Sequence, residues 1–169
     1  QNGPVQKDIN VKVNEKSVTP PTPNDCDAPL LDNGKIVTWK EFWNADFPGP
    51  AYGSENSEIP RRSYLALEFN SGDVSDTGKL ETSELTSTSG RRIGSISKCP
   101  GDFDVAPECD HVWGNGGGIF WSTTGYSGAC DLEPDTTYYF NLTFTNGADA
   151  STSECVDTYC LTMVRHRNP

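Results

Sequence analysis

Six cysteines constrain this chain of 169 residues more than any other feature. An even number of cysteines in a chain of this size predicts a disulfide framework, and disulfides persist in oxidising compartments. Sequence alone leaves many pairings open, but short loops close most readily. We therefore expect the pairs Cys99–Cys109, Cys155–Cys160 and Cys26–Cys130. Zinc is the alternative, yet the chain has no C-x-x-C pair and only two histidines.

The pattern of apolar residues favours strands over helices throughout the chain. The sequence has 16 glycines and 12 prolines, and its hydrophobic residues make up 34% of the total, which is typical of a turn-rich β architecture. Strict alternation predicts strands at 63–69 and 138–145, the latter followed by an Asn-Gly turn signal. Further strands are expected at 79–85, 91–98, 119–123 and 158–164. Residues 35–40 fit a strand, whereas Trp39, Phe42 and Trp43 also fit one face of a short helix.

About seven short strands separated by turn signals predict a two-sheet β-sandwich. The expected organisation is an N-terminal extension strand within residues 1–18, a proline-rich linker at 19–25, and a sandwich domain over 26–169. Residues 47–53 are expected to form a loop. The fold class is therefore an all-β, disulfide-stabilised sandwich with an N-terminal extension strand.

The segment Leu132-Glu-Pro-Asp-Thr-Thr-Tyr138-Tyr-Phe-Asn-Leu142 resembles the L-x-P-x-T-x-Y stretch of fibronectin type III domains. That resemblance implies an Ig-like or fibronectin-like sandwich in which the Tyr138 hydroxyl makes a corner hydrogen bond at the start of a strand. Together with Cys99-Pro-Gly-Asp-Phe103 and the Trp121-Ser-Thr123 strand, it also resembles secreted bacterial Ig-like modules of unassigned function. The resemblance implies a location outside the cytosol and no particular chemistry.

The formal net charge of −11 makes a role in binding nucleic acids implausible, because an acidic surface repels phosphate backbones. No hydrophobic run is long enough to insert into a membrane. The chain begins at Gln1 without a signal peptide, as expected of a mature N-terminus after cleavage or of a piece of a longer protein. A secreted protein, extracellular or at the cell surface, is the expectation.

No cluster of residues predicts catalysis, so we expect a protein that is not an enzyme. Ser95-Ile-Ser-Lys98 has the spacing of serine acyl-enzymes but lies in a predicted strand without the companion motifs. The two histidines, His111 and His166, are expected at the surface. No cofactor is expected, with one exception: a calcium site, because carboxylates cluster around the Cys99–Cys109 loop and Ca²⁺ takes oxygen ligands. The candidate ligands are Asp102, Asp104, Glu108 and Asp110.

The N-terminal strand carries the main functional hypothesis. Residues 8–14 alternate so that Ile9, Val11 and Val13 share one face, and a stiff proline-rich connector follows. A lone strand cannot satisfy its own backbone groups, so it needs a sheet edge to pair with. We expect a homo-oligomer: a subunit of a surface filament or pilus-like appendage that assembles by inserting this strand into a neighbouring subunit.

The second hypothesis is a secreted carbohydrate-binding or adhesion module, with calcium as an optional cofactor. Exposed aromatic rings stack on sugars, and the residues selected for glycan contact are Trp113, Tyr126 and Trp43. Trp121 is assigned to the core. Asn141-Leu-Thr143 is a glycosylation sequon, and strand alternation directs Asn141 away from the face that carries Phe140 and Leu142.

Overall fold

The protein is an all-β, disulfide-stabilised sandwich of two five-stranded sheets. The computed structural model describes Cys26, Leu31 and residues 33–44, 52–84, 91–113, 117–145 and 159–168. The predicted N-terminal extension strand, with Ile9, Val11 and Val13, lies outside these residues. So do the predicted linker at 19–25 and Cys155.

The described elements follow one another as ten strands and one short helix. They are β1 (Asn33–Thr38), α1 (Trp39–Trp43), β2 (Tyr52–Pro60), β3 (Ser63–Asn70), β4 (Thr77–Glu84), β5 (Arg91–Ser97), β6 (Asp110–Trp113), β7 (Gly118–Ser122), β8 (Cys130–Asp131), β9 (Thr137–Thr145) and β10 (Tyr159–Arg167).

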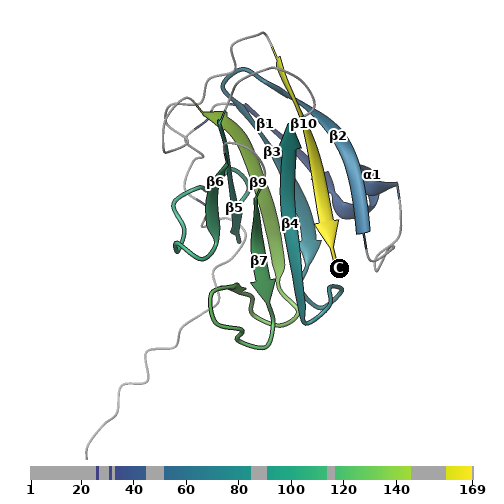
Figure 1. The fold of residues 1–169 in the computed structure, drawn as a ribbon, viewed down its shortest axis with the longest axis vertical. Coiled ribbons are helices and arrows are strands. Elements are labelled where there is room, and N and C mark those ends of the chain that lie inside the picture. Colours follow the sequence, from purple (N-terminus) through teal and green to yellow (C-terminus); the bar gives the residue numbers. More distant parts are fainter. Residues whose placement is uncertain are drawn as a thin grey trace, which may run out of the picture.

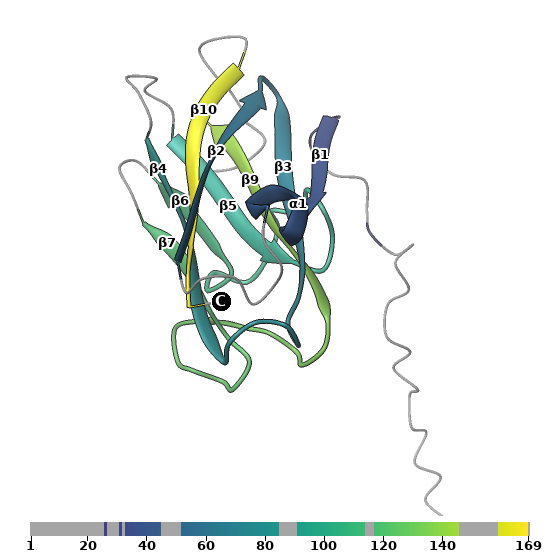
Figure 2. The same cartoon turned by 90° about the vertical axis from the view of Figure 1, so that its right-hand side faces the viewer.

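The two sheets lie face to face and pack around one core. Sheet A has the order β1-β3-β9-β5-β6, and sheet B has the order β2-β10-β4-β7-β8. Sheet B faces the viewer in Figure 1, and Figure 2 shows the layers from the side. Most pairs are antiparallel, whereas the edge strands β1 and β8 run parallel to their neighbours β3 and β7.

Alternation along β3 and β9 builds the core as predicted. The inward residues of β3 are Leu65, Leu67 and Phe69, and each is at most 5% exposed. The alternating set Tyr138, Phe140, Leu142 and Phe144 of β9 packs in the same cluster. Burying these apolar side chains between two sheets is the dominant favourable term for a sandwich of this kind.

The outer face of sheet A is also buried, which the sequence did not predict. A second apolar cluster contains Leu31, Tyr64, Ala66, Ile93 and Phe103. Phe103 belongs to the long connection between β5 and β6, so this connection covers the sheet. The central strands β3 and β9 are therefore buried on both faces, and polar residues of β9 must find partners inside the protein.

The predicted Tyr138 corner is confirmed. The Glu133 backbone N–H donates to the Tyr138 hydroxyl at 3.0 Å, five residues upstream of the ring. Burial raises the pKa of Tyr138, so the hydroxyl stays neutral in this contact.

The predicted cysteine pairing is wrong for both disulfides that lie in the described residues. Cys26 bonds to Cys99, and Cys109 bonds to Cys130. Proximity in sequence failed as a guide because sheet order, which brings β6 and β8 to the same side of the sandwich, decides which cysteines meet. Cys160 is disulfide-bonded as well. Its predicted partner, Cys155, lies outside the described part.

Three strands were not predicted. β2 was partly assigned to a loop because its sequence, Tyr-Gly-Ser-Glu-Asn-Ser-Glu-Ile-Pro, shows almost no apolar alternation. It is an edge strand that directs only Ser57 and Ile59 fully inward, so most of its residues remain polar. β6 and β8 have only four and two residues, too short for a periodic signal.

Candidate functional site

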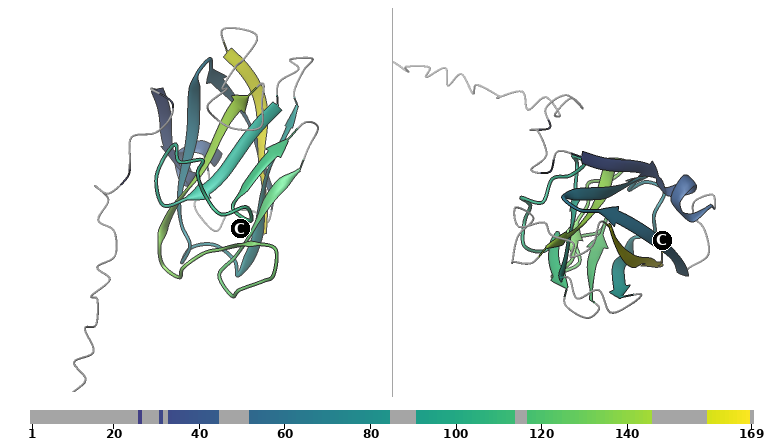
Figure 3. Two further views of the ribbon diagram at one scale, coloured as in Figure 1. Left: turned by 90° about the vertical axis from the view of Figure 1, so that its left-hand side faces the viewer. Right: turned by 90° about the horizontal axis from the view of Figure 1, so that it is seen from above.

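The two sides of the sandwich differ in how their edges are joined. At one side, β6 ends sheet A and β8 ends sheet B, and the Cys109–Cys130 disulfide links them. Cys109 directly precedes β6, and Cys130 lies in β8. Figure 3 (left) looks at this side, where β6 and β7 approach each other. The disulfide therefore closes this side of the sandwich.

At the opposite side, the edge strands β1 and β2 face one another across a groove. Each has a single strand partner among the described residues, β3 for β1 and β10 for β2. No strand of the described part pairs with the backbone edges that face the groove, and edges of this kind can accept a further strand. The space has a volume of about 930 Å³. We call it the β1–β2 groove, and Figure 2 looks into this side of the molecule.

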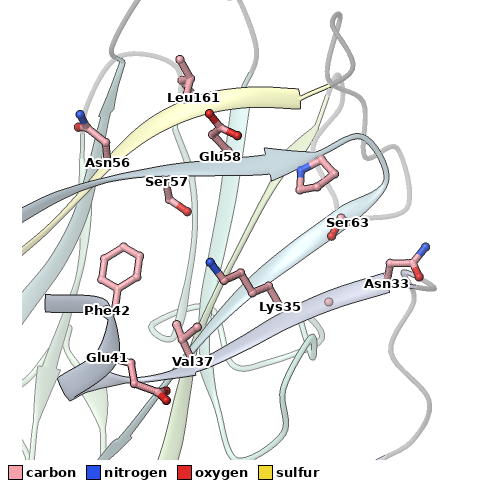
Figure 4. A pocket seen from close by; sticks show the side chains of 12 residues that line it. Asn33, Lys35, Val37, Glu41, Phe42, Asn56, Ser57, Glu58, Ser63 and Leu161 are labelled. Carbon is pink, nitrogen blue, oxygen red and sulfur yellow. The ribbon is translucent and has the colours of Figure 1, made fainter. Parts of the chain in front are cut away.

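The groove is lined by apolar and polar residues from five elements. Figure 4 shows Lys35, Val37, Phe42 and Ser57 directed into the space between β1 and β2. Val37 and Phe42 are half-buried and pack against the central core, so they form an apolar base. The other lining residues are Asn33, Gly34, Glu41, Asn56, Glu58, Pro60, Ser63 and Leu161.

Helix α1 bounds one end of the groove, and its start is fixed by a capping box. The Thr38 side chain accepts from the Glu41 backbone N–H at 3.3 Å, and Glu41 accepts from the Thr38 backbone N–H at 3.0 Å. These bonds satisfy backbone donors that a helix start leaves open. The backbone bond from Thr38, followed by the bond from its hydroxyl, lowers the pKa of Glu41. Glu41 therefore stays charged at the groove.

Both sequence interpretations of residues 35–43 are thus partly correct. The segment is a strand through Thr38 and a helix from Trp39, and the T-x-x-E capping pattern at 38–41 is the signal that marks the switch. The helix ends at Asn44, whose φ of 48° lies in the left-handed region. Trp39 and Trp43 turn inward, which leaves Phe42 at the groove.

Burial excludes two of the three aromatic residues that were predicted to contact a glycan. Trp113 is 1% exposed and Trp43 is 7% exposed, so neither ring can stack on a ligand. The glycines around Trp113 accommodate its ring: a Cβ on Gly94 would lie 2.6 Å from it. Tyr126 is 69% exposed and remains available. Trp121 lies in the core as expected.

Asn141 is not an accessible glycosylation site. It is fully buried, and its side chain organises the connection that covers sheet A. The amide group donates to Ser95 Oγ, Ser97 Oγ and the carbonyls of Cys99 and Asp102. Its oxygen accepts from the Gly101 backbone N–H at 2.7 Å. Alternation directs Asn141 away from the central core, as predicted, but that face is covered by protein rather than solvent.

The predicted calcium ligands do not form a metal site. Among the residues that the structure describes, no three His, Cys, Asp or Glu side chains come close enough to hold a metal ion. Asp102 and Asp104 belong to a turn in which the Asp102 carboxylate accepts from the Asp104 backbone N–H. Glu108 is exposed. Burial raises the pKa of Asp110, and the nearby charge of His111 lowers it by a smaller amount.

The remaining titratable candidates also have structural explanations. Ser95 is buried and hydrogen-bonded within the Asn141 network, and Lys98 pairs with Glu133 at 2.6 Å, so no serine–lysine pair forms. His111 is exposed, as expected. His166 was expected at the surface but is 1% exposed, because β10 continues to Arg167 and directs His166 inward.

Comparison with known proteins adds little to this description. No family model matches the chain, and no curated protein does. A solved structure that matches is PliG from Aeromonas hydrophila, a periplasmic lysozyme inhibitor of g-type lysozyme. It has a TM-score of 0.41 and 8% sequence identity, and the match covers 80% of this chain and 96% of that one. A similarity of this size does not bear on the function of the chain.

The class that the fold defines is a disulfide-stabilised β-sandwich, one side of which is joined by a disulfide while the other has a groove between edge strands. Disulfides of this kind are typical of proteins in oxidising compartments outside the cytosol. The only helix among the described residues, α1, is far too short to cross a membrane.

Proposed function

We propose that the protein is an extracellular subunit of a filament, assembled when residues 8–14 of one copy insert into the β1–β2 groove of the next. The observation that carries this proposal is the groove itself, which is bounded by two edge strands of different sheets. Strand addition at such an edge gains affinity from backbone hydrogen bonds and specificity from alternate side chains.

The dimensions of the ribbon and the groove agree. The part of β1 that lines the groove, Asn33–Val37, spans five residues, or about 16 Å at the usual rise of a strand. The five residues from Ile9 to Val13 would span the same length. Three apolar side chains at alternate positions would then lie over Val37 and Phe42, which form the apolar base of the groove.

The attachment of the N-terminal segment favours insertion into a neighbour. Cys26 is bonded to Cys99, two residues beyond the end of β5. In sheet A, β5 lies three positions from β1, about 14 Å away at normal strand spacing. Cys26 therefore lies at a distance from its own groove, and the proline-rich stretch between it and residues 8–14 disfavours a turn back into that groove. Insertion from copy to copy is heterologous, and repeated head-to-tail insertion produces an open filament unless the rotation between copies closes a ring.

Two variants that differ by one position in the ribbon test the proposal. Val11→Asp places a charge on the face that would enter the groove, whereas Asn10→Asp adds a charge on the opposite face. We expect the wild type and Asn10→Asp to form fibres in negative stain and a ladder of oligomers on size exclusion. Val11→Asp and a chain that lacks residues 1–18 should remain folded monomers. Equal association of all four proteins would disprove strand insertion.

A cross-linking experiment distinguishes insertion into a neighbour from insertion into the same chain. One sample carries Val11→Cys and a second carries Val37→Cys. When the two are mixed under mild oxidation, insertion into a neighbour yields a disulfide-linked pair of chains. A chain that carries both substitutions and cross-links only within itself, at every concentration, would show that the strand completes its own sandwich.

A further inference from the structure

A continuous row of side chains crosses the outer face of sheet B. Strand register aligns Tyr52 of β2 with Arg167 of β10, Arg167 with Lys79 of β4, and Lys79 with Phe120 of β7. Figure 1 looks onto this face, where the four strands follow one another from right to left. We call these four residues the sheet B row. It has an aromatic ring at each end and two cations between them.

The rings are exposed, and each contacts its neighbouring cation. Tyr52 is 48% exposed and Phe120 is 55% exposed, which is high for large apolar side chains. The Arg167 guanidinium lies 6.0 Å from the Tyr52 ring centroid, and Lys79 Nζ lies 5.1 Å from the Phe120 centroid. Such contacts hold a cation beside a ring face without removing it from solvent.

Glu81 fixes the two cations between the rings. Its carboxylate lies 2.8 Å from Lys79 Nζ and 3.1 Å from Arg167 Nε, and the residue is 7% exposed. Burial raises the pKa of Glu81, but the bonds and charges of Lys79 and Arg167 outweigh burial and lower it. Because one carboxylate serves two cations, the positive charge at the row is only partly neutralised.

A hollow adjoins the Phe120 end of the row. It has a volume of about 360 Å³ and is lined by Lys79, Phe120 and Arg167 of the row and by Tyr126, the most exposed large aromatic residue of the described part. Thr77 and Asn168 also line the hollow and add polar groups. The combination of ring faces with hydroxyl, amide and cationic groups is suited to a sugar ring that carries an acidic substituent.

Charge complementarity identifies the occupant. Arg165 of β10 pairs in register with Glu81 and lies one ladder position beyond the row on the same face. Arg165, Arg167 and Lys79 therefore share this region with one carboxylate, Glu81. The whole chain carries −11, and the acids Glu58 and Asp131 lie farther along the same face, so the excess of cations is confined to the surroundings of the row. A polyanion would be repelled elsewhere and attracted here.

We propose that the outer face of sheet B binds an acidic polysaccharide across the sheet B row. Sugar rings stack on Phe120 and Tyr126 at one end and on Tyr52 at the other. Carboxylate or sulfate groups of the polysaccharide meet Lys79 and Arg167 between them. The row spans three strand spacings, about 14 Å, so it accommodates a short run of linked sugars. This surface is separate from the β1–β2 groove, and binding here does not depend on assembly.

The test measures binding of the full chain to polygalacturonate, to dextran sulfate and to neutral dextran, by tyrosine and tryptophan fluorescence and by affinity electrophoresis. We expect saturable binding to at least one polyanion and none to neutral dextran. The polyanion that binds distinguishes carboxylate from sulfate recognition. Phe120→Ala should weaken binding at least fivefold, and the double variant Lys79→Gln/Arg167→Gln at least tenfold.

Two control variants separate site binding from general effects of hydrophobicity or charge. Ile36→Ala removes a side chain of similar exposure on sheet A, and Arg91→Gln removes an exposed cation on β5. Both should bind like the wild type. The proposal is overturned if neither polyanion binds at low ionic strength, if neutral dextran binds equally well, or if Phe120→Ala binds as tightly as Ile36→Ala. Fluorescence of the free variants and urea unfolding verify that each is folded.

Discussion

The imidazole ring of His166 lies edge to face against the Trp43 indole, with 4.7 Å between ring centroids and an interplanar angle of 76°. Trp39 packs against the same imidazole at 4.9 Å. His166 belongs to β10 and both tryptophans belong to α1, so this contact fastens the helix that bounds the β1–β2 groove to sheet B. The Nδ1 atom of His166 has no hydrogen-bond partner among the described residues.

This contact predicts a loss of stability in mild acid. Burial lowers the pKa of His166 from 6.5 to about 4. Between these values the unfolded chain binds a proton that the folded chain excludes, so the stability from this site is full above pH 6.5 and falls as the pH drops towards 4. The loss is on the order of 3 kcal/mol across the window. Urea unfolding at pH 7, 6, 5 and 4.5 measures it.

Substitution of His166 tests whether the buried imidazole causes that loss of stability. His166→Gln should flatten the dependence of unfolding free energy on pH between 6.5 and 4.5, whatever its effect at pH 7. Identical slopes for wild type and His166→Gln would show that the buried imidazole does not exclude its proton.

The Asn141 network predicts a large effect from a small substitution. Asn141→Ala removes the acceptor for the Gly101 N–H and the donor to four oxygens, and leaves several buried polar groups unpaired. We expect a loss of about 3 kcal/mol in unfolding free energy, since each unpaired buried group carries a desolvation penalty. Thr137→Ala, an exposed change on the same strand, should cost less than about 0.5 kcal/mol.

Hydrogen exchange locates the Asn141 effect. The Gly101 amide should exchange faster in Asn141→Ala. Amides in the middle of β3 should lose only as much protection as the loss of global stability requires. If Asn141→Ala unfolds at the same urea concentration as wild type, the connection between β5 and β6 is held by other contacts.

Local pattern predicted the centre of the sandwich and failed at its edges. Alternation in β3 and β9 identified core residues such as Leu67 and Phe140, and the motif around Tyr138 predicted its corner hydrogen bond. Edge strands such as β2 bury few residues, so they show no periodic signal. Disulfide pairs depend on the whole arrangement of strands: Cys99 and Cys109 flank the connection between the neighbouring strands β5 and β6, yet each bonds to a cysteine outside that connection.

Residues of the candidate sites were misassigned where a second layer of structure covers a sheet. Asn141 alternates away from the core, yet the connection that contains Phe103 lies over it. Trp113 is the last residue of strand β6 rather than part of a free loop, and Gly94 leaves room for its ring. The sheet B row was missed for a different reason: Tyr52, Lys79, Phe120 and Arg167 are adjacent only in strand register, which a single sequence does not reveal.

The corner hydrogen bond predicts a difference between two adjacent tyrosines. Tyr138→Phe removes the acceptor for the Glu133 N–H in a partly buried turn and should lower the unfolding free energy by about 1 kcal/mol. Tyr139→Phe removes a bond from the Tyr139 hydroxyl to the Glu68 carboxylate at 3.1 Å, closer to solvent, and should cost less. The same or a greater loss for Tyr139→Phe would contradict a stabilising role for the corner.

The asymmetry between the two sides of the sandwich predicts the effect of opening the closed side. Cys109 and Cys130 are separated by 21 residues, and a cross-link of that span stabilises by about 3 kcal/mol in the chain-entropy model. The unfolding free energy of the double variant Cys109→Ser/Cys130→Ser should fall by about that amount. When this side opens locally, the edges of β6 and β8 that face each other should become exposed.

Exposed edges promote pairing between chains, so that double variant should also aggregate more readily when residues 1–18 are absent. Light scattering at 37 °C compares it with the same truncated chain that retains both cysteines. A truncated double variant that remains as soluble as its parent, despite the lost stability, would mean that β6 and β8 stay joined by packing alone. The disulfide would then stabilise this side without being needed to keep it closed.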